Sequence, residues 1–131
     1  MTSPCPFCER VAAGGAEFGN AHALAFPDGF PVSPGHTLVI PRRHCRGLFD
    51  LKPDEYAAVW ALAREVHDTL HQHLHPDGFN VGANDGVAAG QTVPHAHVHV
   101  IPRFDGDVPD PRGGVRWVMP DRAAYWEGRD P

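Results

Sequence analysis

Three histidines in alternate positions are the feature of this sequence with the clearest chemical potential. His95, His97 and His99 alternate with apolar residues in a run that proline closes at both ends. Successive side chains of a β-strand face opposite sides of the sheet, so a strand over 95–101 would carry the three imidazoles on one face and send the apolar residues into the core. Neighbouring histidines would then lie roughly 6.5–7 Å apart at their backbones. The alternative, a polar strand facing solvent, is disfavoured by the apolar flanks.

A loop rich in glycine and alanine, residues 85–91, leads into this run. Backbone N–H groups at Gly90, Gln91 and Thr92 could approach a phosphate closely, and the Gln91 amide and Thr92 hydroxyl add further donors. A neutral imidazole is a competent nucleophile near pH 7, and its attack on phosphorus gives a phosphoimidazole that water can cleave. The pattern therefore indicates chemistry on a phosphate, with the other histidines holding or moving protons.

Strands and one helix must position these groups. Apolar runs over 22–26 and 36–41 predict two strands that pair in a hairpin-like arrangement, and residues 79–84 predict another short strand. Apolar residues recur every three or four positions from Tyr56 to Leu74, which predicts a helix that begins at Pro53 and ends before Pro76. His67 and His71 lie four apart on this helix, a spacing open to a metal pair, although boundary histidines without a ligand are the simpler interpretation.

Length and charge restrict the function classes. The chain has 131 residues, 42% of them hydrophobic and 21% charged, which predicts one globular domain. Fourteen glycines and fourteen prolines disfavour a helical bundle. A net charge of −5 argues against nucleic acid and anionic membranes as partners. With no apolar stretch near the ~20 residues of a membrane span and no apolar leader over residues 1–10, we expect a cytoplasmic protein.

The segment from Gly90 to Arg103, GQTVPHAHVHVIPR, resembles the signature of the histidine triad (HIT) family. Residues 24–28 and 34–41 are also typical of that family and lie at the usual distance upstream. The resemblance covers about residues 5–103 and leaves 104–131 as an irregular tail of a single domain, 1–131. It implies an α+β fold, a HIT-like five-stranded antiparallel sheet with one long helix, paired into a homodimer.

The resemblance also implies a function. HIT proteins hydrolyse nucleotides at the α-phosphate through a covalent nucleotidyl-histidine intermediate; the substrate would be a dinucleoside polyphosphate, such as diadenosine tetraphosphate, or a nucleoside phosphoramidate. His97 would be the nucleophile, His99 would contact the phosphate and assist the leaving group, and His36 would orient protons behind the row. The remaining substrate contacts would be Asn84, Gly90, Gln91 and Thr92 around the phosphate, Phe7, Phe26 and Leu38 around the base, and Asp28 at the ribose.

A pair of cysteines near the start of the chain predicts a second site. Cys5-x-x-Cys8 supplies half of a tetrahedral zinc site, or else a redox pair. By resemblance to bacterial HIT proteins, His44 and His95 would complete a structural zinc site, which would release His95 from catalysis. Cys45, next to His44, is a competing ligand.

Other interpretations remain open at this stage. A metal-dependent phosphohydrolase would use His97 and His99 as ligands of a catalytic metal, and a nucleotide-binding module would lack turnover. In the tail, Arg112 and Arg116 could meet distal phosphates while Trp117 stacks on a second base, or the tail could pack on a dimer partner.

Overall fold

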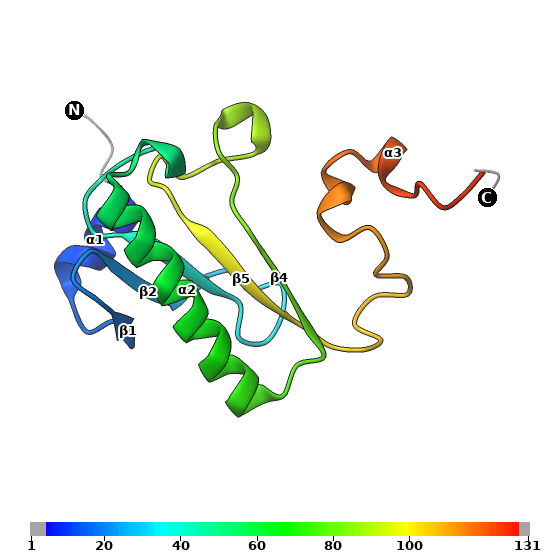
Figure 1. Ribbon diagram of the computed structural model, residues 1–131, viewed down its shortest axis with the longest axis horizontal. Coiled ribbons are helices and arrows are strands. Elements are labelled where there is room, and N and C mark those ends of the chain that lie inside the picture. The colour runs from blue at the N-terminus through cyan, green and yellow to red at the C-terminus, as the bar shows by residue number, and fades with distance from the viewer. Residues whose placement is uncertain (1–4, 129–131) are drawn as a thin grey trace.

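The computed structural model describes residues 5–128, so both ends of the predicted domain, residues 1–4 and 129–131, lie outside the described part. One antiparallel sheet organises the chain (Figure 1). Its strands, in the spatial order β1-β2-β3-β5-β4, are β1 Phe18–Gly19, β2 Ala23–Pro27, β3 Thr37–Pro41, β5 Val98–Arg103 and β4 Gly78–Gly82. Every neighbouring pair is antiparallel. The expected α+β fold with five strands is confirmed, and β2 and β3 form the expected hairpin-like pair.

The long helix α2, Pro53–Leu74, confirms the predicted helix and covers one face of the sheet (Figure 1). Its side chains Val59, Leu62 and Val66 are fully buried against inward-facing residues of β2, β3 and β5. Burial of each such side chain stabilises the fold by about 1.5–3 kcal/mol. The two ends of the predicted apolar stripe, Tyr56 and Leu74, are instead well exposed.

A short helix that the sequence pattern did not predict, α1 Pro6–Ala13, lies over the opposite face of the sheet. Only Phe7 of this helix is buried, in a small core of β2 and β3 side chains: Leu24, Phe26, Leu38 and Ile40. The signals for α1 were proline at its first position and glycine after its last, where Gly14 adopts φ 67°. Both faces of β2 and β3 are therefore covered, which explains why these strands read as continuous apolar runs.

The histidine strand is shorter than predicted. β5 begins at Val98; residues 93–95 form a bend, and residues 96 and 97 are not part of a regular strand. The bend has its own backbone contacts, because His95 N–H donates to the Val93 carbonyl and Ala96 N–H to the Cys45 carbonyl. The prediction of a strand from His95 is therefore wrong at its start, because His95 and His97 precede β5 and only His99 lies on it.

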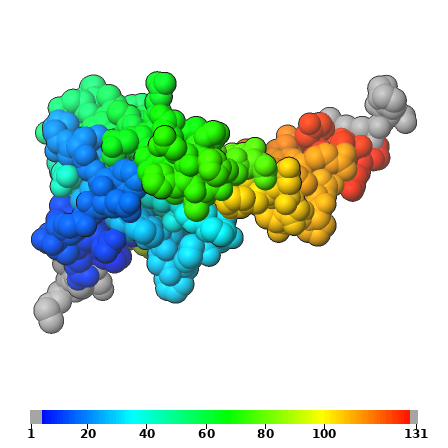
Figure 2. All heavy atoms as spheres, turned by 90° about the horizontal axis from the view of Figure 1, so that it is seen from below, coloured from blue at the N-terminus to red at the C-terminus, as the bar shows by residue number. Residues whose placement is uncertain are grey.

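The tail, coloured orange to red, projects away from the sheet (Figures 1 and 2). It contains two short helical turns, a 3₁₀ turn at Gly114–Val118 and α3 at Pro120–Ala123, where the sequence suggested irregular chain. Cation–π contacts join Arg112 to Trp126 and Arg116 to Tyr125 within the tail. Across residues 5–128, the helices are all too short or too polar to traverse a lipid bilayer.

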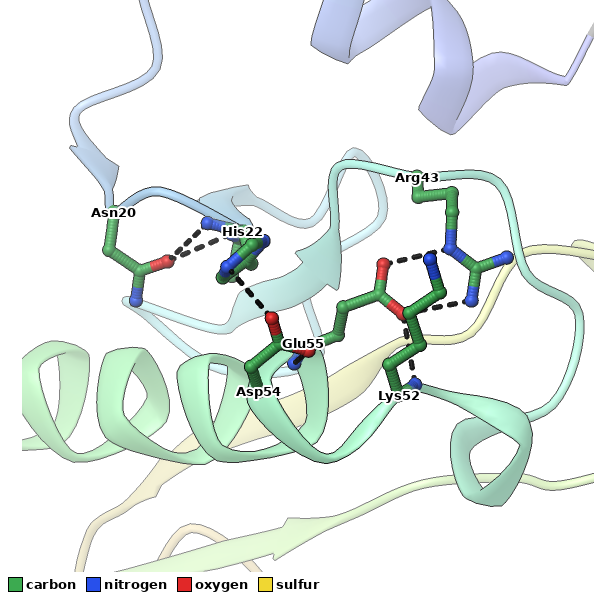
Figure 3. A network of polar contacts seen from close by, with 7 residues as sticks. Asn20, His22, Arg43, Lys52, Asp54 and Glu55 are labelled. Carbon is green, nitrogen blue, oxygen red and sulfur yellow. Dashed lines mark hydrogen bonds and ion pairs between the residues drawn. The ribbon is translucent and has the colours of Figure 1, made fainter.

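An ion pair between the exposed Arg43 and the buried Glu55 joins the loop after β3 to the start of α2 (Figure 3). Arg43 donates through Nε and Nη2 to the two carboxylate oxygens of Glu55, each at 2.8 Å, and the Lys52 backbone N–H donates to the same carboxylate. The side-chain hydrogen bond from Arg43 is the main reason that the pKa of Glu55 falls to about 2. The residue after Arg43 is His44, so the ion pair lies next to one of the predicted zinc ligands.

We expect Glu55→Gln to remove an acid-sensitive part of the stability. The pKa of Glu55 is lower in the folded chain than in the unfolded chain, so its stabilisation is complete above pH 4.5 and is lost as the pH falls towards 2. At neutral pH the variant should melt roughly 5 °C below wild type. Thermal unfolding followed by circular dichroism between pH 7 and pH 3 measures this. A wild-type and a variant curve that stay parallel over that range would contradict the assignment.

Candidate functional site

A cleft of about 1100 Å³ opens beside the histidines on the face of the sheet that α1 covers. Its walls are α1, the loop between β2 and β3, and the glycine-rich loop before β5. Most of the predicted site residues meet here: His36, His97, His99, Asp28, Asn84, Gly90, Thr92, Phe7, Phe26 and Leu38. The structure thus brings together residues from four separated parts of the chain.

The hydrogen bonding of His97 leaves one ring nitrogen free as a nucleophile. Its Nδ1 lies 2.8 Å from the backbone carbonyl oxygen of His95, and because a carbonyl only accepts, Nδ1 carries the proton. Nε2 therefore holds the lone pair. His97 is 7% exposed and lines the cleft, so this lone pair is available to a substrate placed there.

His36 and His99 form a proton relay whose direction the backbone sets. Val32 N–H donates to His36 Nδ1 at 3.1 Å, so His36 carries its proton on Nε2. That proton is donated to His99 Nδ1 at 2.9 Å, which leaves His99 with a proton on Nε2. The His97 and His99 rings are adjacent, with centroids 5.2 Å apart. A nucleophilic lone pair and an N–H donor consequently stand side by side.

Burial keeps this relay neutral. Burial, followed by the neighbouring His97 and His36, lowers the pKa of His99 to about 4, and burial also lowers the pKa of His36. Near neutral pH both imidazoles are therefore uncharged, and His99 offers a hydrogen-bond donor rather than a standing positive charge. The Asp28 carboxylate, 3.4 Å from His36 Nε2, is the nearest group that opposes the lowering.

At the end of the cleft where we expected a phosphate, one residue differs from the prediction. Asn84, Thr92 and Gly90 line it, and Gly90 adopts φ 94°, a conformation that favours glycine. Gln91, in contrast, is buried behind the loop: its amide donates to the Arg46 and Val93 carbonyls and accepts from Gly86 N–H. Its own backbone N–H donates to the Gly86 carbonyl. In this structure Gln91 shapes the loop and has no donor left for a phosphate.

Aromatic side chains form the other end. The Phe7 ring lies edge-on to Phe26 at 5.5 Å and to His97 at 5.1 Å between centroids. Arg10, which sequence reasoning missed, lies over the Phe26 ring at 4.5 Å and lines the same end. Because α1 was not predicted, the sequence showed only that Arg10 follows Phe7 by three residues. A base entering this end would meet apolar walls with one guanidinium at the rim.

A second cluster joins the cysteine pair to the histidine segment. Cys5, Cys8, His44 and His95 each present one ligand atom, and these four atoms lie within 4.8 Å of one another. His95 Nε2 donates to the Pro41 carbonyl at 2.8 Å, so its Nδ1 lone pair faces the thiols. A hydrogen bond from the other ring nitrogen to a backbone carbonyl is the usual way to orient a histidine that binds a metal.

The donor set suits zinc. Burial and the neighbouring Cys5 thiol raise the pKa of the Cys8 thiol, so a cation bound at the cluster would be needed to favour the Cys8 thiolate. Two sulfurs and two imidazoles are a common tetrahedral zinc shell. Cys45 does not belong to the cluster: it is buried in the main core, with its thiol directed at the Gly47 carbonyl. All three cysteines are free, as a metal site requires.

The other candidate groups do not extend the site. His67 and His71 have ring centroids 6.1 Å apart, and His67 packs on Phe79 instead of converging on a ligand position. In the tail, Arg112 pairs with Asp110, and Arg116 donates to the Ala123 and Arg122 carbonyls. Neither arginine lines the cleft of its own chain.

Comparison with known proteins agrees with this geometry. The HIT domain family matches residues 18–106. An uncharacterised HIT-like protein of Mycoplasma genitalium, MG132, is 40% identical over 107 residues, which cover 79% of this chain and 76% of that protein. An asymmetrical bis(5'-nucleosyl)-tetraphosphatase of Schizosaccharomyces pombe is 45% identical over 85 residues, 65% of this chain and 47% of that enzyme.

A solved structure extends the similarity over nearly the whole chain. A zinc-bound histidine triad family protein from Mycobacterium smegmatis superposes with a TM-score of 0.72 at 34% identity, covering 95% of this chain and 97% of that one. The triad run, the sheet order and the sequence match all agree, and this chain belongs to the HIT domain family.

Proposed function

We propose that this protein hydrolyses a nucleoside phosphate derivative at its α-phosphorus, with His97 as the nucleophile. His97 Nε2 forms a bond to phosphorus while the bond from phosphorus to the leaving group breaks. His99 Nε2–H donates to the departing atom. Water then attacks the nucleotidyl-His97 phosphorus and gives a proton back to His99 Nε2, the phosphorus–nitrogen bond breaks, and a nucleoside monophosphate leaves with both imidazoles restored.

The complementary tautomers of His97 and His99 carry this proposal. A catalytic metal held by both rings would require a lone pair on each accessible nitrogen, yet the hydrogen bond from His36 leaves a proton on His99 Nε2. The same pair, one nucleophile and one donor, is what covalent phosphoryl chemistry requires. A module that only binds nucleotides has no need for a free nucleophilic lone pair at the phosphate.

The other site residues have supporting roles in the proposal. Asn84 and Thr92, with Gly90 allowing close approach, orient the phosphate oxygens. Phe7, Phe26 and Leu38 enclose the base, and Asp28 accepts from the ribose hydroxyls. Zinc at Cys5, Cys8, His44 and His95 is structural and takes no part in the bond changes.

Trapping the intermediate tests the proposal directly. The wild-type protein is mixed with a nucleotide substrate labelled at the α-phosphorus, quenched in alkali after milliseconds to seconds, and analysed by mass spectrometry. We expect an acid-labile adduct on the peptide that contains residues 95–99, assigned to His97. If no labelled protein is found at any time point and turnover depends on added metal, the result would favour the metal-dependent phosphohydrolase.

The cleft predicts a preference among substrates. Arg10, at the base end, is the one lysine or arginine among its lining residues within the described chain, and it is accompanied by Glu9 and Asp28. A long polyphosphate would leave several charges unmatched in a protein of net charge −5. We therefore expect kcat/KM for adenosine phosphoramidate to exceed that for diadenosine tetraphosphate by about tenfold or more. A reversed ratio at low and at moderate salt would contradict this.

The tail supports a homodimeric assembly as part of the proposal. Several large apolar side chains of the tail are exposed, among them Val115, Trp117, Val118 and Met119. We propose that a second copy of this single-domain chain covers them and that the dimer acts in the cytoplasm on small nucleotides, without nucleic acid or membrane partners. Sedimentation equilibrium would show whether the chain has twice its monomer mass.

A further inference from the structure

The first helix, α1, connects the two sites of the molecule. Cys5 stands at its N-terminus and Cys8 in its first turn, so both sulfur ligands flank Phe7. The other face of the helix turns to the nucleotide cleft, with Pro6, Phe7, Glu9, Arg10 and Ala13 among the lining residues. One element therefore carries half of the metal shell and a whole wall of the base end.

This helix has few means of holding its place alone. It is eight residues long, and isolated helices of that length are marginal in water. Phe7 is its only buried side chain, packed on Phe26 and on the imidazoles of His95 and His97. Its other contacts with the body are Arg10, which lies over the Phe26 ring, and the cysteine sulfurs, at 3.2 Å from Cys8 to His44 Nδ1 and 3.5 Å from Cys5 to His95 Nδ1.

The same four ligands also affect the nucleophile His97, through the backbone carbonyl of His95. The His95 ring is fixed between the thiols and the Pro41 carbonyl, and the His95 backbone carbonyl accepts the Nδ1 proton of His97 at 2.8 Å. Displacement of the His95 ring would move the acceptor that sets the His97 tautomer. Both the base wall and the orientation of the nucleophile depend on one set of four ligands.

We propose that Cys5, Cys8, His44 and His95, closed on a zinc ion, assemble the nucleotide cleft by seating α1, so that nucleotide affinity depends on an intact ligand set while the sheet and α2 do not. This inference rests on the proposed function. If α1 is seated for only a tenth of the time without the complete set, the apparent Kd for a nucleotide rises about tenfold. The four ligands are positioning residues, because none of them touches the reacting atoms.

The experiment compares AMP binding, zinc content and local hydrogen exchange in matched variants of the full chain. His44→Ala removes a ligand that is exposed and lies outside α1, and Cys8→Ala removes one inside it. We expect both variants to lose zinc, to bind AMP at least about tenfold more weakly in titration calorimetry, and to exchange amide protons faster over residues 7–13 while β2, β3 and α2 exchange as in wild type. Cys8→His, which keeps a zinc ligand, should recover most of the affinity.

Two controls separate the coupling from general damage. Cys45→Ala removes the neighbouring thiol outside the shell and should retain both zinc and AMP affinity. Phe7→Ala should retain zinc and lose affinity. If Cys8→Ala does not fold, chelator-treated wild type supplies the same three measurements.

The outcomes also separate this inference from the proposed function. Zinc-free protein that binds AMP as tightly as the zinc-loaded form, or wild-type protein that takes up no zinc, would overturn the coupling. A trapped nucleotidyl-His97 in the same samples would leave the proposed function standing. If even the zinc-loaded wild type fails to form that adduct, the proposed function fails, whatever the AMP titrations show.

Discussion

Replacing His97 by alanine is expected to abolish turnover, with a loss of at least about 10⁴-fold in kcat, while the chain folds normally. The reason is that His97 Nε2 is the one unprotonated imidazole nitrogen presented by the adjacent His97–His99 pair. Its lone pair is fixed by the Nδ1–H donation to the His95 carbonyl. Without it, water must attack phosphorus directly, and the reaction loses its covalent intermediate. Steady-state kinetics with a nucleoside phosphoramidate measures the loss.

A matched control shows whether the loss is specific to His97. His71→Ala removes an imidazole that is exposed on α2 and far from the cleft lining, so it should turn over substrate at the wild-type rate. The His97→Ala protein should still bind AMP within a few fold of wild type, because the base wall remains. Substantial turnover by His97→Ala, with no adduct in wild type, would refute the covalent mechanism.

Helices and strands could be predicted from the spacing of apolar residues where that spacing fits only one kind of element. The helix from Pro53 to Leu74 was predicted with its correct limits, because an apolar repeat, a proline at the start and a proline after the end all agree. The hairpin-like pair of β2 and β3 was also predicted, from its two apolar runs. The two-residue strand β1 was not, since Phe18–Gly19 contains no period to detect and pairs with β2 only through tertiary context.

The residues of the candidate site could be predicted from the sequence, but the hydrogen bonds between them could not. The triad run predicted His97 and His99, and the resemblance added His36. The tautomers of these histidines, however, depend on the Val32 backbone N–H and the His95 backbone carbonyl, and the identity of a side chain does not reveal such backbone contacts. Gln91 shows the converse. Its place in the motif suggested a phosphate contact, but the bend of the loop turns its amide inward to three backbone groups.

The four residues of the cysteine site were predicted, but the helix α1, which begins between Cys5 and Cys8, was not. A C-x-x-C pair gives no indication of whether the intervening residues coil or extend, and eight residues are too few for a convincing apolar period. Only the structure shows that the two cysteines flank the first turn of a helix whose other side lines the cleft. The proposed coupling between the two sites therefore rests on this placement, which no motif contains.

The second large effect is expected at His99. We expect His99→Ala to lower kcat by about 10²–10⁴-fold for a substrate with an amine leaving group, which must gain a proton as the bond to phosphorus breaks. The neutral ring presents Nε2–H because His36 donates to its Nδ1 at 2.9 Å. A substrate that releases nitrophenolate, which departs without a proton, should lose much less activity.

Comparing two variants then identifies what the imidazole supplies. Glutamine at position 99 can place an amide N–H near the position of Nε2–H, so His99→Gln should recover part of the activity if a hydrogen bond to the phosphate is the main contribution. If proton delivery dominates, His99→Gln and His99→Ala should be equally slow on the amine substrate and equally competent on the nitrophenyl one. His36→Ala should follow the same leaving-group pattern more weakly, because it acts only by holding the His99 tautomer. Equal losses on both substrates in every variant would show that the relay does not serve the leaving group.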